Sequence, residues 1–258
     1  MKLAKDNRQI GLARVLSKLG YCSRSQAAEM IRSGRVQLNG TTCRNAETPV
    51  HLRRDRIAVD GRAIFAAPKI YLLLNKPRGV VTTASDEKGR DTVYSCLGEA
   101  LPWVGPVGRL DKASEGLLLL TNDSEWASRL SDPSTHLDKT YHVQVGILAD
   151  ETLAAALVKG VRTGPEEILR AKGARILRTG ERNAWLEIVL DEGKNRQIRR
   201  MLEGLGIEVL RLIRIAVGPL QLGRVAKGEY RAVTAEEKRA LDQAIRGIGT
   251  QSAIREER

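Results

Sequence analysis

The stretch GRLDKASEGLLLLTND, residues 108–123, places the acidic Asp111 shortly before four consecutive leucines. This leucine run, residues 117–120, is apolar enough to predict a buried strand. Two interpretations of Asp111 follow from its position. It can be a turn residue that caps the loop before a core strand, which is a common role for aspartate near glycine-containing turns. It can also be a catalytic acid that the strand delivers to the floor of a pocket.

The composition of the chain predicts a globular protein with its own core. The chain has 258 residues, of which 42% are hydrophobic, and this suits one large domain or two smaller ones. No run reaches the roughly 18 apolar residues of a membrane span, and the first ten residues carry no apolar stretch of signal-peptide length. We therefore expect a cytoplasmic protein without membrane association. The three cysteines and three histidines form no ligand cluster, which predicts reduced thiols and no metal site.

The charge balance of the chain favours a polyanionic partner. Lysine and arginine together number 43 and aspartate and glutamate 31, for a formal net charge of +12 and a pI near 9.9. Such an excess binds nucleic acid through the release of condensed counterions.

The N-terminal segment predicts two short helices and a hairpin. Residues 10–19, IGLARVLSKL, have apolar residues at helical spacing. A second helix is expected to begin at a capping box formed by Ser23 and Gln26 and to end at Gly34. The sequence RVQLNG then predicts a strand that enters an Asn39-Gly40 turn, which is a strong hairpin signal.

Basic residues are concentrated in this segment. Between residues 10 and 57 there are nine lysines and arginines, including Arg53, and only three acids. A solvated basic face would also have this composition. A DNA-reading helix-turn-helix fits less well, because a hairpin follows the second helix directly. We interpret residues 1–60 as a compact basic module, and we expect Arg14, Arg24, Arg32 and Arg35 to be among its contacts to nucleic acid.

The pattern changes from Ile70 onward to an α+β domain. Five apolar runs predict strands near residues 70–75, 116–121, 139–146, 184–190 and 208–217. Helical patterns fall near residues 124–130, 150–158 and 195–205, without regular alternation of strand and helix. This order predicts a mixed or largely antiparallel sheet. The expected division is a module at 1–60, a linker at 61–69, a catalytic domain at 70–246 and a flexible tail at 247–258.

The motifs exclude several kinds of chemistry. We find no phosphate-binding loop of the Gly-x-x-x-x-Gly-Lys-Ser/Thr type, no Gly-x-Gly-x-x-Gly fingerprint and no Gly-x-Ser-x-Gly elbow. The reaction is therefore expected to use side chains alone, without a cofactor. Residues 191–206, DEGKNRQIRRMLEGLG, predict a helix with Arg196, Arg199 and Arg200 opposite an apolar stripe. These arginines either form a solvated face, or one turns inward to hold a carboxylate while the others meet phosphates.

Several motifs resemble known RNA-modifying proteins. LARVLSKLGYCSRSQAAEMIRSGRVQLNG, residues 12–40, resembles the alpha-L RNA-binding domain found in a ribosomal protein and in RNA-modifying enzymes. YLLLNKPRGVVTT, GRLDKASEGLLLLTND, LDKTYHVQV and EGKNRQIRRM resemble, in order, the motifs of RsuA-type ribosomal RNA pseudouridine synthases. The resemblance extends over about residues 10–240. Ser114 stands where that family usually has threonine, and it retains the hydroxyl group.

The resemblance implies a pseudouridine synthase fold and a role for each matching residue. Asp111 matches the catalytic aspartate, Tyr141 the ring that stacks on the target base, and Arg199 the basic residue paired with the aspartate. Arg109 and Lys76 match positions near the site, and together with Arg196 and Arg200 they are expected to contact RNA. The implied reaction is the isomerisation of a uridine in ribosomal RNA by a monomeric enzyme without a cofactor or metal.

The target within the ribosome is less determined. EGKNRQIRRM and the segment LIRIAVGPLQLGRVAKGEYRAVT, residues 212–234, resemble the large-subunit members of the family more closely, and this resemblance favours large-subunit RNA. Two alternatives are the same reaction on small-subunit RNA and a non-catalytic RNA-binding or ribosome-assembly factor. A DNA-binding regulator is a further class, for which we find no dimerisation element.

Overall fold

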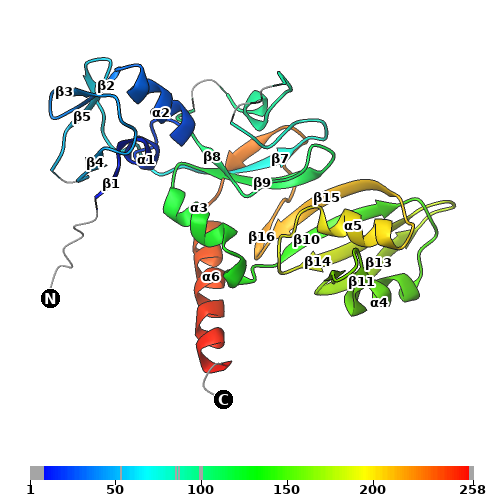
Figure 1. Cartoon of the computed structure of the whole chain (residues 1–258). Coiled ribbons are helices and arrows are strands. Elements are labelled where there is room, and N and C mark those ends of the chain that lie inside the picture. The colour runs from blue at the N-terminus through cyan, green and yellow to red at the C-terminus, as the bar shows by residue number, and fades with distance from the viewer. Residues whose placement is uncertain (1–8, 53, 85, 87, 99–100, 256–258) are drawn as a thin grey trace. The chain divides into compact units, whose positions relative to one another are not determined.

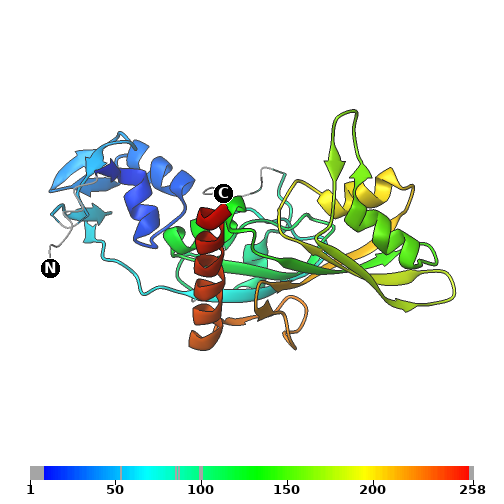
Figure 2. The same cartoon turned by 90° about the horizontal axis from the view of Figure 1, so that it is seen from below.

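The computed structural model describes residues 9–52, 54–84, 86, 88–98 and 101–255, with side chains to residue 246. The chain forms two compact units, which Figures 1 and 2 show as ribbons. Unit 1 comprises Met1–Tyr71, Gly98–Gly105 and Leu120–Glu125. Unit 2 comprises Leu72–Leu97, Pro106–Leu119 and Trp126–Arg258.

Unit 1 contains the two helices and the hairpin that the sequence predicts. The capping box of α2 is confirmed, because Ser23 Oγ accepts from the Gln26 backbone and Gln26 Oε1 accepts from the Ser23 backbone. Asn39 and Gly40 have φ angles of 53° and 85°, which are the left-handed values that a two-residue hairpin turn needs. The elements of this segment are β1 (Ile10–Gly11), α1 (Leu12–Lys18), α2 (Arg24–Arg32), β2 (Val36–Leu38), β3 (Thr41–Cys43), β4 (Pro49–Val50), β5 (Ile57–Val59) and β6 (Arg62–Ala63).

The connector after β6 makes several hydrogen bonds within unit 1. The Ala67 backbone donates to Leu19 O at 2.9 Å. The Asn122 side chain accepts from the Ile70 backbone at 2.9 Å and donates to Pro68 O at 2.8 Å. These bonds hold the part of the connector that follows β6, which has no helix or strand of its own. Arg53, one of the predicted basic residues, lies outside the described residues.

The strands that follow form one mixed sheet. Among the described residues the sheet has nine strands in the order β13-β14-β10-β15-β9-β7-β17, with β16 paired to β15 and β8 to β9. β10 is antiparallel to β14 and β15, whereas β9 and β15 are parallel. The strands are β7 (Tyr71–Lys76), β8 (Gly105–Val107), β9 (Glu115–Thr121), β10 (Lys139–Val145), β13 (Gly173–Thr179), β14 (Ala184–Leu190), β15 (Val209–Val217), β16 (Leu220–Gln221) and β17 (Tyr230–Ala232). The α+β class predicted from the sequence is confirmed.

The leucine run of the opening stretch is the central strand β9. Every residue from Glu115 to Thr121 is buried, since β15 and β7 flank this strand. Gly116 permits the close approach of β15. Its φ is 102°, and a Cβ atom at this position would lie 2.3 Å from the Arg214 carbonyl oxygen. Only glycine fits here without moving the backbone.

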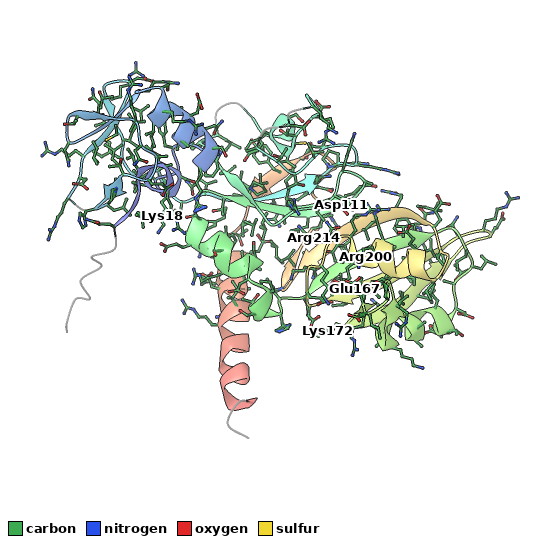
Figure 3. The ribbon with its side chains drawn as sticks, in the orientation of Figure 1. Lys18, Asp111, Glu167, Lys172, Arg200 and Arg214 are labelled. Atoms are coloured by element: carbon green, nitrogen blue, oxygen red, sulfur yellow. The ribbon has the colours of Figure 1, made fainter. Side chains whose placement is uncertain are left out.

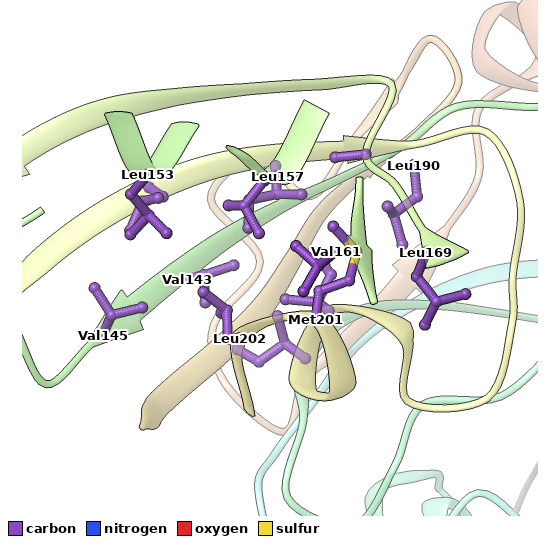
Figure 4. Packing of buried hydrophobic residues seen from close by; sticks show 14 of the residues in the cluster. Val143, Val145, Leu153, Leu157, Val161, Leu169, Leu190, Met201 and Leu202 are labelled. Carbon is purple, nitrogen blue, oxygen red and sulfur yellow. The ribbon is translucent and has the colours of Figure 1, made fainter. Parts of the chain in front are cut away.

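Helices α4 and α5 cover one face of strands β10, β14 and β15 (Figure 2). Figure 4 shows the packing, in which Leu153 and Leu157 of α4 lie in one cluster with Met201 and Leu202 of α5. On α5 the predicted apolar stripe is buried except for Leu205, which is 39% exposed. The remaining elements are η1 (Val93–Cys96), α3 (Ser124–Ser131), η2 (Pro133–Thr135), α4 (Glu151–Lys159), β11 (Val161–Arg162), β12 (Ile168–Leu169), α5 (Gln197–Gly204) and α6 (Ala235–Arg255).

The C-terminal segment differs from the sequence prediction. We predicted a flexible tail from residue 247, but the backbone of α6 is helical from Ala235 to Arg255. Each further residue of a helix adds a backbone hydrogen bond, and this offsets the weak helix propensity of the glycines at 247 and 249. Residues 256–258 lie outside the described part. No helix among the described residues has the length and apolarity needed to cross a membrane.

Candidate active site

The loop that carries Asp111 is held through its backbone. All five carbonyl oxygens from Leu110 to Ser114 accept hydrogen bonds. Lys76 Nζ donates to Asp111 O and to Ser114 O. Thr82 Oγ1 donates to Leu110 O, and an Arg199 guanidinium nitrogen donates to Ala113 O. The Ser114 backbone donates to Asp111 O and the Gly79 backbone to Lys112 O. Donors from three separate segments thus fix the path of the loop and leave the Asp111 side chain free.

Lys76 lies beneath this loop at the end of β7. Its side chain is completely buried, and Nζ donates to the carbonyl oxygens of Pro77, Asp111 and Ser114 at 3.1, 3.2 and 2.9 Å. Burial lowers the pKa of Lys76 to about 8. The prediction that Lys76 contacts RNA is therefore wrong. Its three donors are used by the backbone of the loop, and none of the ammonium group is accessible to a ligand.

Arg199 contacts the same loop from α5. One guanidinium nitrogen donates to Ala113 O at 3.0 Å, while Nε is buried without a hydrogen-bond partner. Burial lowers the pKa of Arg199, as do the charges of Arg196 and Arg78, whereas the negative charge of Asp111 opposes this shift. The predicted pairing of Arg199 with Asp111 is thus electrostatic. No ion pair within 4.0 Å joins the two side chains, and the direct contact is to the loop backbone.

Asp111 lines a pocket of about 530 Å³ in unit 2. The Asp111 carboxylate has no hydrogen bond or ion pair with any other residue of the described chain. Tyr141 of β10 also lines the pocket, with apolar walls that include Leu119, Leu190 and Leu212. The site therefore combines an available carboxylate, an aromatic ring and apolar surface, which suits a flat polar ligand.

Asp111 also lines a second pocket, of about 440 Å³. Its lining includes Arg109, Asn195, Lys88 and the ion pair of Arg90 with Asp86. Arg109 borders both pockets. Arg109 and Lys88 thus place positive charge beside the site, as expected for a polyanionic substrate.

The remaining basic residues that the sequence selected are placed differently. Arg196 lines the first pocket, at the N-terminal end of α5 and with a left-handed φ of 49°. Arg200 does not line either pocket, because its guanidinium forms an ion pair with Glu167 and a hydrogen bond to Thr163 at 3.4 Å (Figure 3). Arg200 is thus paired within the protein, and its contact with RNA stays a prediction.

The four arginines predicted in the N-terminal module all lie in unit 1. Arg32 pairs with Glu29 at 2.6 Å and Arg35 with Asp60 at 2.6 Å, and both pairs are exposed. Arg14 and Arg24 are exposed, and neither forms an ion pair with another described residue. Exposed ion pairs contribute little to stability, so they exchange readily for a phosphate partner.

Sequence reasoning did not assign several polar residues that line the pocket, among them Lys139, Arg214 and Ser114. Lys139 and Arg214 come from β10 and β15, and Ser114 comes from the loop itself. The Ser114 hydroxyl is buried without a hydrogen-bond partner. Figure 3 labels Arg214 together with Asp111. The alternation of β10 was a usable signal, since Lys139 and Tyr141 are two residues apart and share a face of the strand. Arg214 gave no such signal, because its position depends on a pairing between strands distant in sequence.

Two family models, several relatives and a solved structure match this chain. The family model described as RNA pseudouridylate synthase matches residues 70–204, and the S4 domain model matches residues 10–57. The chain is 35% identical over 231 residues to the "Ribosomal large subunit pseudouridine synthase B" of Bacillus subtilis (strain 168), which covers 89% of this chain and 94% of that protein. It is 37% identical over 228 residues to an uncharacterized RNA pseudouridine synthase of Rickettsia prowazekii (strain Madrid E), covering 86% and 94%. A crystal structure of a pseudouridylate synthase matches with a TM-score of 0.62 and 29% identity, over 90% of this chain and 99% of that one.

These similarities define the chain as an RNA-modifying enzyme. More narrowly, it belongs to the RNA pseudouridylate synthase family and carries an S4 domain at its N-terminal end. The family membership that the sequence motifs predicted is thereby confirmed.

Proposed function

We propose that this chain converts one uridine of large-subunit ribosomal RNA to pseudouridine, with Asp111 as the catalytic residue. The observation that carries the proposal is the Asp111 carboxylate, which has no partner among the described residues and lines the same pocket as Tyr141. A structural aspartate would be expected to hydrogen-bond its own loop, whereas this loop is held entirely by other groups. We further propose that the enzyme acts as a monomer in the cytoplasm.

The reaction breaks one bond of the nucleoside and forms another. The bond from N1 of uracil to C1′ of ribose breaks, the base turns, and C5 bonds to C1′. A proton leaves C5 and N1 gains one, so the product is an isomer of the substrate and no cofactor is consumed. The carboxylate of Asp111 serves as nucleophile or base at the sugar, and either role requires its ionised form. Tyr141 holds the flat base by stacking while the base is detached from the sugar.

The target uridine has to leave its helical stack before it can reach Asp111. Unstacking costs on the order of a few kcal/mol, and the apolar and aromatic surface of the pocket offsets this cost. Arg109 and Arg196, which border the pocket, are placed to contact the flanking phosphates. Lys76 and Arg199 act as positioning residues, because both bind the backbone of the Asp111 loop.

The N-terminal module is proposed to hold the RNA rather than to react with it. Residues 1–60 carry exposed arginines, and the motifs with catalytic residues begin after Ile70. Arg14, Arg24, Arg32 and Arg35 are the proposed phosphate contacts. Residues 70–246 form the proposed catalytic domain, with residues 61–69 as the connector.

The large ribosomal subunit is the favoured source of the substrate. Its support is the 35% identity to a protein named as a large-subunit pseudouridine synthase, over 89% of this chain. Small-subunit RNA is the alternative target, and a binding factor without activity is the alternative function.

A pseudouridine map of ribosomal RNA tests the proposal. Cells lacking the gene are complemented with the wild-type chain, with Asp111→Asn, or with Glu181→Gln as a matched control in an exposed turn. We expect one large-subunit pseudouridine to disappear on deletion and to return with the wild-type and Glu181→Gln chains alone. A lost site in small-subunit RNA would change the target, and restoration by Asp111→Asn would remove Asp111 from the catalytic role.

A further inference from the structure

Two cations flank Tyr141 in the pocket. Lys139 precedes Tyr141 by two residues on β10, so both side chains point to the same face of the strand. Arg214 is the direct partner of Tyr141 in the pairing of β10 with β15. All three residues line the pocket that contains Asp111. The ring therefore has a positive charge beside it along its own strand and another across the sheet.

Neither cation has a carboxylate partner among the described residues. Arg214 is 7% exposed, and its Nε donates to Leu117 O at 2.8 Å. The carboxylates whose charges act on Lys139 are Asp138 and Asp191. Asp138 is paired with Lys172 at 2.8 Å, and Asp191 lies 3.5 Å from His136.

The proximity of these two like charges is unfavourable by itself. Burial and the charge of Arg214 lower the pKa of Lys139. Partly buried charges of like sign that are not joined to a carboxylate in an ion pair raise the free energy of the folded state. Such groups concentrate where a ligand or a transition state supplies the missing charge. An anion that forms in the pocket would fill this role.

The position of the two cations favours the base over a phosphate. Arg214 is almost completely buried, beside the apolar walls formed by Leu190 and Leu212. A phosphate keeps its charge at all times and is better served by the exposed Arg109 and Arg196 at the rim. A base stacked on Tyr141, in contrast, presents its carbonyl edges to the side chains that surround the ring.

We infer that Lys139 and Arg214 bind the carbonyl oxygens of the uracil anion that exists between cleavage and reattachment. The inference rests on the proposed reaction. When the bond from N1 to C1′ breaks, its electron pair stays with uracil, and the negative charge is shared among N1, O2 and O4. The charge disappears when C5 bonds to C1′, its proton leaves and N1 is protonated. The cations therefore stabilise the reacting state more than the bound substrate.

The first test separates this role from RNA binding. With an RNA that contains the mapped uridine, Lys139→Met is expected to lower the single-turnover rate at saturating enzyme about 100-fold, as for the loss of one preorganised donor to a developing anion. The affinity for RNA and its salt dependence stay at the wild-type values. Lys139→Arg retains most of the rate, because the charge remains. Lys159→Met is the matched control, since Lys159 is an exposed lysine of α4 in the same unit and contacts no pocket.

The pH dependence provides a second readout that a purely structural lysine would not change. Lys139 loses its proton at alkaline pH, in a setting that Arg214, Asp138 and Asp191 share, whereas an arginine at this position stays charged. We expect the wild-type rate to fall on the alkaline side and the rate of Lys139→Arg to persist to higher pH. Arg214→Lys is expected to lower the rate while keeping RNA affinity, with thermal unfolding as the check on its fold.

Each other outcome overturns the inference. One such outcome is that Lys139→Met keeps the single-turnover rate at saturating enzyme but reduces the slope of log RNA affinity against log salt by about 0.7. That reduction is expected for one lost phosphate contact on a single strand, and it would mean that Lys139 binds phosphate instead. If neither quantity changes, the cation has no part in the reaction. A wild-type chain that forms no pseudouridine would instead contradict the proposed function, which is a separate result.

Discussion

The basic side chains around Asp111 and those of the S4 domain are held in opposite ways. Lys76 is buried and Arg199 is partly buried, and both donate to backbone carbonyl oxygens of a single loop. Arg32 and Arg35 are exposed and pair with carboxylates, whereas Arg14 is exposed without a partner in the described chain. The first group cannot exchange its partners without moving the loop. The second group can give up a weak surface pair whenever a phosphate arrives.

The difference separates two uses of positive charge in one RNA enzyme. Cations bound to carbonyl oxygens determine where Asp111 lies, and they affect the rate of the reaction. Cations at the surface determine how strongly RNA is held, and they affect the salt dependence. Substitutions in the two groups should therefore change different measured quantities, and the following predictions use that separation.

Among substitutions of these cations, the largest expected effect is that of Arg199→Ala. The substitution removes the donor to Ala113 O and the positive charge that acts on Asp111. We expect the single-turnover rate at saturating enzyme to fall by about 10²- to 10³-fold, which is typical for the loss of one preorganised charged group. RNA affinity is expected to change much less, and Arg199→Lys to recover part of the rate. A rate equal to that of the wild-type chain would show that the loop does not need Arg199.

The second prediction concerns the stability contributed by Lys76 as a function of pH. Its pKa is about 8 in the folded chain, below the ordinary lysine value of 10.5. Between these values the unfolded state binds more protons, so raising the pH stabilises the folded state. Relative to Lys76→Met, the wild-type free energy of unfolding should therefore rise by about 3 kcal/mol from below pH 8 to above pH 10.5.

Urea unfolding of the two chains at a series of pH values measures this difference. The other titrating groups are common to both chains and cancel in the comparison. A difference that stays constant with pH would mean that Lys76 titrates normally. A decrease with rising pH would mean that the hydrogen bonds to Pro77, Asp111 and Ser114 hold the ammonium form more strongly than burial opposes it.

The sequence predicts local structure and the identity of the acid well. The capping box at Ser23, the turn at Asn39 and Gly40, and the buried strand after Asp111 each depend on neighbours in sequence. These features follow from short-range rules of hydrogen bonding and periodicity.

The same reasoning could not distinguish the partners of similar cations. Arg199 and Arg200 are adjacent, yet one binds Ala113 O and the other binds Glu167. Lys76 and Arg214 bind carbonyl oxygens 38 and 97 residues away in sequence. Such contacts depend on strand order and on the direction of each side chain, and neither can be derived from composition or spacing.

The third prediction concerns the exposed arginines of the S4 domain. Replacing Arg14 and Arg24 together with glutamine should reduce the slope of log affinity against log salt by about 1.4 to 1.8, as for two lost phosphate contacts. The rate at saturating RNA should remain unchanged. Arg32 and Arg35 should contribute less than Arg14 and Arg24, because each first has to leave its carboxylate.

A salt titration of RNA affinity measures these slopes, with Lys159→Gln as the control in the other unit. An unchanged slope for the Arg14 and Arg24 double variant would mean that α1 and α2 do not contact phosphate. Equal slopes for both pairs would mean that the surface ion pairs do not limit binding.

The smallest effect is expected for Arg200→Gln, although Arg200 is adjacent to Arg199, whose substitution is expected to have the largest effect among these cations. The Arg200 guanidinium is paired with Glu167, and the two side chains are 30% and 40% exposed. Solvent screens a pair of this exposure, so the loss in the free energy of unfolding should stay below about 1 kcal/mol. A double-mutant cycle with Glu167→Gln isolates the pair from the other contacts of each residue. The single-turnover rate and the salt slope should both equal the wild-type values, because Arg200 lines neither pocket. A slope reduced by one phosphate contact would show that Arg200 leaves Glu167 for RNA, and the separation between internally bound and RNA-binding cations would then not hold on α5.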